Sequence, residues 1–131
     1  NILKYIRKID RDAEELSHLL ATHAHPDHIG SAISVAKKTG ARVIAHRADT
    51  KRRGNGASLN YMGVFGSLPV PLPFFERTPV ATLVDEGDVL TIAGGIRLIH
   101  TPGHTPGSVC FLEEGTGSLF SETPYSVTRT V

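Results

Sequence analysis

The sequence predicts an α/β fold in which a parallel βαβ unit is followed by a run of antiparallel strands. Between residues 18 and 45, two short apolar runs flank a stretch of small and apolar residues at helical spacing. A strand–helix–strand order of this kind implies adjacent parallel strands. From residue 80 onward, short apolar runs alternate with Gly- and Asp-containing turns, a pattern typical of antiparallel strands.

The first element is an amphipathic helix, because apolar residues recur at helical spacing with basic residues between them. Its apolar positions are Ile2, Leu3, Ile6 and Ile9. Residues 12–15 then read as a short acidic turn. The apolar run 18–22 predicts a buried strand that ends directly before a cluster of histidines.

The βαβ unit continues with a helix over 29–39, for which Gly40 is the expected stop. Residues 42–45 predict the second strand. We expect His46 to begin another helix over 47–53, in which the basic run Lys51–Arg53 forms a solvated end rather than a binding patch.

The segment 55–79 is rich in glycine and proline and is too long for an ordinary connection. Two interpretations stay open: a surface excursion that lines a binding cleft, or a loop packed on the core through its aromatic residues. Beyond it the expected strands are 80–84, 89–92, 96–99, 108–112 and 119–120.

Composition restricts the classes of partner. The 131 residues suffice for a single domain, taken to span 1–131. Lys plus Arg number 14 against 13 Asp plus Glu, which does not favour a nucleic acid or an anionic membrane as a partner. The one cysteine, Cys110, lies in an apolar run and is expected to be a buried strand residue. No apolar stretch is long enough to span a bilayer, and a cytoplasmic location is favoured.

The chemistry is concentrated in the run after the first strand. His23, His25, Asp27 and His28 lie within six residues of one another. Residues two apart in an extended segment project to the same side, so His23 and His25 could grip one metal ion. Asp27 and His28 follow Pro26, which forces a turn, and their side chains would face a second position in space, apart from the one that His23 and His25 share. Imidazole and carboxylate together suit Zn²⁺, Fe or Mn.

A further ligand candidate, His104, comes from far along the chain. It is framed on both sides by Thr, Pro and Gly, so its loop is stiff at the prolines and can turn tightly at the glycines. The remaining histidines have structural interpretations. His18 begins a strand, His46 begins a helix, and His100 ends a strand near the site, where it could support a ligand.

These two motifs resemble the best-known motifs of the metallo-β-lactamase superfamily. They read T-H-A-H-P-D-H-I-G from Thr22 and H-T-P-G-H-T-P-G-S from His100. The resemblance covers nearly the whole chain and implies an αββα sandwich, present in part, with a two-metal site at the sheet edges. By the family pattern, His23, His25 and His104 would hold the first metal. Asp27 and His28 would hold the second, and Asp27 would also orient the attacking hydroxide or shuttle a proton.

The sequence departs from the family pattern near its end. Where the family has a Gly-Asp pair whose aspartate bridges the two metals, Glu122 is the only carboxylate. Its side chain is one methylene longer, so whether Glu122 is a metal ligand stays open. The family's last histidine and its opening strands have no counterpart here. The domain 1–131 is therefore expected to be a truncated member with exposed sheet edges, which favour a homodimer.

The resemblance implies a metal-dependent hydrolase that binds Zn²⁺, two ions in the intact family, with Fe or Mn as alternatives. A small-molecule thioester, lactone or related ester would be hydrolysed through a metal-bound hydroxide. The alternative is a truncated metal-binding domain with little or no activity. A nuclease-type member is disfavoured because the sequence predicts no basic surface.

Overall fold

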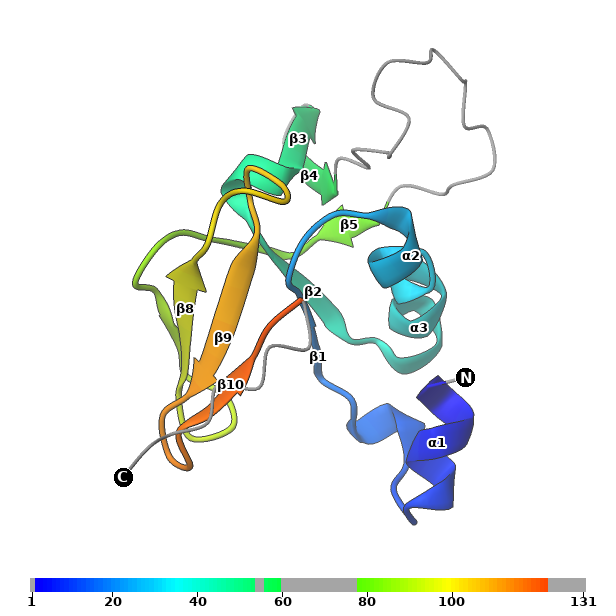
Figure 1. The fold of residues 1–131 in the computed structure, drawn as a ribbon. Coiled ribbons are helices and arrows are strands. Elements are labelled where there is room, and N and C mark those ends of the chain that lie inside the picture. Colours follow the sequence, from blue (N-terminus) through cyan, green and yellow to red (C-terminus); the bar gives the residue numbers. More distant parts are fainter. Residues whose placement is uncertain (1, 54–55, 60–77, 123–131) are drawn as a thin grey trace.

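The fold is layered around a small parallel sheet (Figure 1). The computed structural model describes residues 2–53, 56–59 and 78–122. The central sheet has the order β1-β2-β6, and both pairings are parallel. Helices α2 (Pro26–Ile29) and α3 (Ala32–Thr39) lie on one side of this sheet, and an antiparallel sheet lies on the other. The strands of the central sheet are β1 (His18–Ala21), β2 (Arg42–His46) and β6 (Thr82–Val84).

Strand β2 is apolar on both faces because both faces of the sheet are covered. Val43 packs toward the helices in a buried cluster with Ile29 of α2. Ile44, its neighbour in sequence, belongs to a second cluster with Leu98 and Phe111 of the antiparallel sheet. Successive side chains of a strand point to opposite faces. Alternate side chains of β2 therefore pack into two hydrophobic clusters, one on each face of the central sheet.

The antiparallel sheet has the order β10-β9-β8-β7, and its strands follow one another along the chain. A third, smaller antiparallel sheet has the order β3-β4-β5. The strands of the four-stranded sheet are β7 (Val89–Leu90), β8 (Ile96–His100), β9 (Val109–Glu113) and β10 (Ser118–Phe120). The strands of the smaller sheet are β3 (Thr50–Arg53), β4 (Gly56–Leu59) and β5 (Pro79–Val80).

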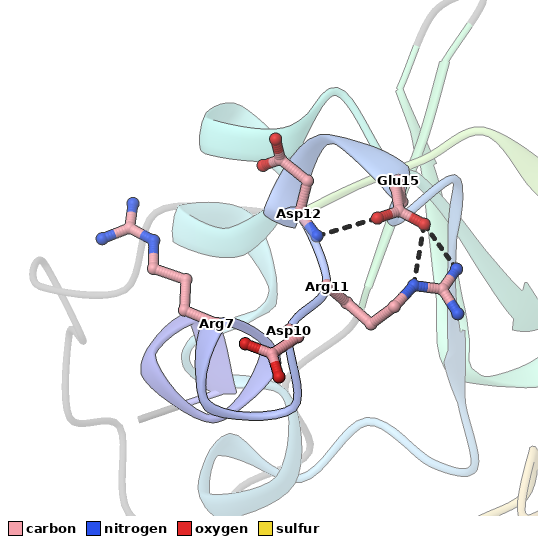
Figure 2. Close-up of a pocket in the computed structure, with 5 residues that line it drawn as sticks. All are labelled: Arg7, Asp10, Arg11, Asp12 and Glu15. Carbon is pink, nitrogen blue, oxygen red and sulfur yellow. Dashed lines mark hydrogen bonds and ion pairs between the residues drawn. The ribbon is translucent and has the colours of Figure 1, made fainter.

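The chain begins with helix α1 (Ile2–Lys8), which contains no buried residue, and the 3₁₀ turn η1 (Ala13–Glu15). Figure 2 shows the exposed, charged hollow at their junction. The Glu15 carboxylate accepts hydrogen bonds from the Arg11 guanidinium and, at 2.8 Å, from the Asp12 N–H. The predicted helix and acidic turn are both confirmed. The turn is held by its own charges and capping box rather than by burial.

The parallel βαβ unit and the glycine stop are confirmed, and the antiparallel run is confirmed from Val89 onward. Gly40 ends α3 in the left-handed conformation with φ of 77°, which a residue without Cβ adopts at little cost. The helix predicted over 29–39 is α3, which begins at Ala32, and a separate short helix, α2, ends at Ile29. Cys110 lies half-buried in β9 with a free thiol.

The helix predicted over 47–53 is wrong. A single 3₁₀ turn, η2 (Arg47–Asp49), is followed by β3, so the basic run Lys51–Arg53 lies in a strand and not at a helix end. The physical reason is pairing: Thr50 to Arg53 align antiparallel with residues 56–59. Local propensity did not reveal this partner, because strand stability comes from cross-strand neighbours.

Two further expectations need correction. The strand predicted over 80–84 is two strands in different sheets, and the second of them, β6, pairs parallel with β2 rather than antiparallel. The segment 55–79 is not wholly a loop, because Gly56–Leu59 forms β4 and Pro79 begins β5. Its cleft-lining and core-packing interpretations concern residues 60–77, which lie outside the described residues. No helix in the described part of the chain is long and apolar enough to cross a membrane.

Candidate metal centre

The candidate site lies at the edge where β1 and β2 end. The carboxyl ends of parallel strands meet at one edge of a sheet, and functional groups of α/β proteins gather there. The histidine run follows β1 directly, and the loop 101–107 between β8 and β9 reaches the same edge. Two backbone hydrogen bonds fix that loop. Val109 N–H donates to the Thr22 carbonyl at 2.9 Å, and Thr101 N–H donates to the Ser108 carbonyl at 2.8 Å.

Three imidazoles from these two segments converge. His23, His25 and His104 each offer one ring nitrogen, and these atoms all lie within 4.8 Å of one another. Nδ1 of His25 lies 2.8 Å from Nε2 of His104, which comes from 79 residues further along the chain. His23 is buried, His25 is half-buried and His104 is exposed, so the group opens toward solvent on the His104 side.

His23 differs from the other two in its surroundings. Its Nδ1 lies 3.0 Å from Glu122 Oε2 and 3.3 Å from Thr22 Oγ1. Its Nε2 is buried and finds no hydrogen-bond partner among the described residues. Burial, followed by the charge of the nearby His28, lowers the pKa of His23 below its usual value, and Glu122 opposes that shift. The neutral form, which is the metal-binding form of imidazole, is therefore favoured.

The other predicted site residues are placed as follows. His28 lies in α2 with its ring centroid 4.2 Å from that of His23. Asp27 lies in the same short helix, but its side chain is outside the described part of the structure. The Glu122 carboxylate contacts His23 and also accepts a hydrogen bond from Ser108 Oγ at 3.2 Å. Glu122 therefore lies at the site, next to one ring nitrogen of a predicted ligand.

Asp49 is a site residue that sequence reasoning missed. Asp49 is only 1% exposed. Its carboxylate accepts hydrogen bonds from Ala24 N–H at 2.9 Å, from Thr105 Oγ1–H at 2.7 Å and from Gly107 N–H at 2.7 Å. It therefore ties the histidine run to the His104 loop. A signal existed in the sequence: Asp49 follows β2 as His23 follows β1, and the ends of adjacent parallel strands share an edge. The erroneous helix over 47–53 hid this position.

A second imidazole pair supports the loop from the β8 side. His46 and His100 stack with centroids 4.0 Å apart and an interplanar angle of 17°. His46 Nδ1 accepts the Ala48 N–H that begins η2, and His100 Nε2 donates to the Pro106 carbonyl at 2.8 Å. His100 ends β8 as predicted, whereas His46 ends β2 and caps the 3₁₀ turn η2 instead of beginning the predicted helix. Burial, followed by His100, lowers the pKa of His46 below its usual value.

The donor set fits a transition metal. Three imidazole nitrogens suit Zn²⁺, and ligands bound at about 2.0–2.1 Å lie at most about 4.2 Å apart, so small side-chain shifts would suffice. The strongest indication of a metal site is Nε2 of His23, which has no hydrogen-bond partner in the described part of the chain. A buried polar atom without a partner costs about 1–3 kcal/mol. A metal ion at this point would accept its lone pair.

The comparison with known proteins agrees with this geometry. The sequence profile of the metallo-beta-lactamase superfamily matches residues 1–121. The chain belongs to the metallo-beta-lactamase superfamily. Its mixed α/β architecture is accordingly a partial metallo-β-lactamase fold.

The relatives and solved structures that this chain resembles include a hydroxyacylglutathione hydrolase and beta-lactamases. A hydroxyacylglutathione hydrolase, GloC of Haemophilus influenzae, is 30% identical over 117 residues, which are 84% of this chain and 50% of that protein. A beta-lactamase from Chitinophaga pinensis superposes with a TM-score of 0.66 at 28% identity, covering 85% of this chain and 40% of that one. The class B3 di-zinc metallo-beta-lactamase LRA-12 from an Alaskan soil metagenome gives 0.67 at 28% identity, with the same coverage. The chain thus spans half or less of the length of these relatives.

Proposed function

We propose that this metallo-β-lactamase-fold chain forms the metal-binding part of a hydrolase that cleaves a thioester, lactone or related ester of a small molecule. The observation that carries the proposal is the convergence of one ring nitrogen each of His23, His25 and His104 within 4.8 Å of one another. In addition, Nε2 of His23 is buried and has no hydrogen-bond partner among the described residues. His23, His25 and His104 would hold the first metal ion. A bound Zn²⁺ would polarise a carbonyl and lower the pKa of a water molecule toward 7.

The chain's own residues contribute position and protonation state. Burial lowers the pKa of His23 and so favours its neutral form, and the Asp49 carboxylate holds the two segments that carry the proposed ligands at a fixed separation. The exposed His104 side of the group leaves access for a substrate. Asp27 and His28 would form the second metal site, with Asp27 orienting the attacking oxygen or moving its proton.

Thioester substrates rank first because several relatives are named hydroxyacylglutathione hydrolases, and a hydroxyacylglutathione is a thioester. Lactones and related esters share the carbonyl chemistry. The similar solved structures are lactamases, so a β-lactam belongs in any substrate panel. The balance of acidic and basic residues does not support a nucleic-acid substrate.

The test combines metal content with hydrolysis. The 131-residue chain should bind zinc removable by a chelator and hydrolyse at least one of a hydroxyacyl thioester, a lactone and a β-lactam. Loss of a residue that merely supports a metal ligand costs about 10–100-fold in affinity, so His104→Ala should cost at least that much. His18→Ala is the matched control, because His18 begins β1 and bonds to Ser17.

Two results would count against the proposal. If the His104→Ala and His18→Ala variants bind zinc with equal affinity, the proposed metal centre at His23, His25 and His104 is ruled out. Tight zinc binding with no hydrolysis of any substrate would instead favour the alternative of a metal-binding domain with little or no activity.

A further inference from the structure

A buried chain of polar groups connects the two ends of the candidate site. Asp49 accepts from Thr105 Oγ1, and Thr105 N–H donates to Ser108 Oγ at 3.0 Å. Ser108, fully buried directly before β9, donates to Glu122 Oε2. The same oxygen lies 3.0 Å from His23 Nδ1, and the Glu122 side chain is 17% exposed. Glu122 is therefore anchored on one side and in contact with a predicted ligand on the other.

The donor and acceptor roles along this chain follow from elementary chemistry. An ionised carboxylate only accepts hydrogen bonds, so a proton must lie on His23 Nδ1 for the contact to be attractive. A neutral imidazole carries one N–H, which leaves Nε2 with a free lone pair. That Nε2 is the buried atom without a hydrogen-bond partner among the described residues, and the His23 ring centroid lies 4.9 Å from that of His25 and 4.8 Å from that of His104.

We propose that Glu122 is a positioning residue that fixes the Nδ1–H tautomer and ring orientation of His23, so that Nε2 faces the metal site. This role rests on the proposed metal-dependent function and differs from that of the bridging aspartate in the family pattern, because Glu122 would support a ligand instead of being one. Carboxylates that hold the second nitrogen of a ligating histidine raise its basicity and select its tautomer.

The first test needs no metal. Long-range ¹H–¹⁵N NMR of the histidine rings reports which nitrogen is protonated, and it should show His23 Nδ1–H in the metal-free wild-type chain. Glu122→Gln keeps an acceptor oxygen and should keep this tautomer, whereas Glu122→Ala should yield a mixture. Glu14→Ala, an exposed glutamate of η1, is the control. Circular dichroism establishes that each variant is folded. Ser108→Ala removes the anchor of Glu122 together with the acceptor of the Thr105 N–H, and it should shift the tautomer in the same direction as Glu122→Ala.

The second test measures metal. Competition with a chromophoric chelator should show zinc affinity about 10–100-fold weaker in Glu122→Ala, with less loss in Glu122→Gln and an unchanged number of bound ions. Loss of one whole metal equivalent in both variants would overturn the proposal and make Glu122 a direct ligand. An unchanged tautomer in folded Glu122→Ala would also overturn it. If the wild type shows the expected tautomer but binds no zinc, the proposed function fails while the contact between Glu122 and His23 is upheld.

Discussion

At the scale of single residues, two buried histidines prefer to be neutral for the same physical reason. His46 is 7% exposed, and its Nδ1 already accepts the Ala48 N–H, so a proton there would break a bond and place a charge in a desolvated position. The stacked His100 adds a further unfavourable charge when it is protonated. Both effects lower the pKa of His46 relative to the unfolded value of about 6.5.

This shift predicts a stability that depends on pH. The unfolded chain takes up a proton at about 6.5 more readily than the folded one, so the free energy of unfolding should fall as pH falls below that value. Above it, the contribution is fully present. His46→Asn keeps an acceptor for Ala48 N–H but cannot be protonated, so its stability should change less between pH 7 and 5. Urea unfolding of the metal-free protein at several pH values measures this.

In His46→Asn the dependence of the free energy of unfolding on pH should be reduced rather than abolished. The pKa of the buried His23 is also lowered, and this residue contributes in the same direction. Identical pH dependence in wild type and His46→Asn would contradict the assignment.

At the scale of elements, the site depends on how closely two loops approach. Gly107 lies so near Asp49 that an added Cβ would come within 2.6 Å of the Asp49 Cγ. This contact allows Gly107 N–H to reach the carboxylate and sets the distance between the β8–β9 loop and η2. Glycine is required here by space, not by backbone conformation.

Asp49→Ala should therefore destabilise the fold strongly. It leaves the N–H groups of Ala24 and Gly107 buried without an acceptor, at about 1–3 kcal/mol each, so we expect a loss of about 2–5 kcal/mol in the free energy of unfolding. Denaturant unfolding measures this loss. Glu14→Ala, at an exposed position of η1, should change stability by less than about 0.5 kcal/mol.

Gly107→Ala tests the same contact from the other side. It should be destabilising in the wild type and less so in the Asp49→Ala background, where the opposing carboxylate is gone. Strictly additive effects would show that the two residues do not determine each other's position.

At the scale of the whole molecule, the antiparallel sheet ends at an apolar strand. Within the described residues, β10 pairs only with β9, and Leu119 and Phe120 are 39% and 56% exposed. A free edge beside exposed apolar side chains invites pairing with another chain. We therefore expect the 131-residue chain to self-associate, as a dimer or a larger species, with increasing concentration.

Sedimentation velocity over a range of concentrations tests this expectation. Phe120→Lys should shift the equilibrium toward monomer. Ile9→Lys, at a similarly exposed apolar position beyond the end of α1, should not. A wild-type monomer at every concentration would contradict the expectation.

The sequence by itself predicted the βαβ unit, most of the antiparallel strands and a group of side chains suited to binding a metal ion. Periodicity and the glycine stop defined the βαβ unit. The H-x-H-x-D-H spacing that begins at His23, together with the distant His104 framed by Pro and Gly, indicated a metal centre. These features are local: strand alternation, helix termination and ligand type depend on neighbours in the chain.

Only the tertiary structure decided which distant groups meet. It paired β6 parallel with β2, turned the predicted helix at Thr50–Arg53 into a strand, and placed the Asp49 carboxylate between the two ligand segments. It also set Glu122 against His23 Nδ1. Sheet pairing and buried hydrogen bonds depend on which groups fold together across long sequence separations, and neither propensity nor spacing along one chain carries that information.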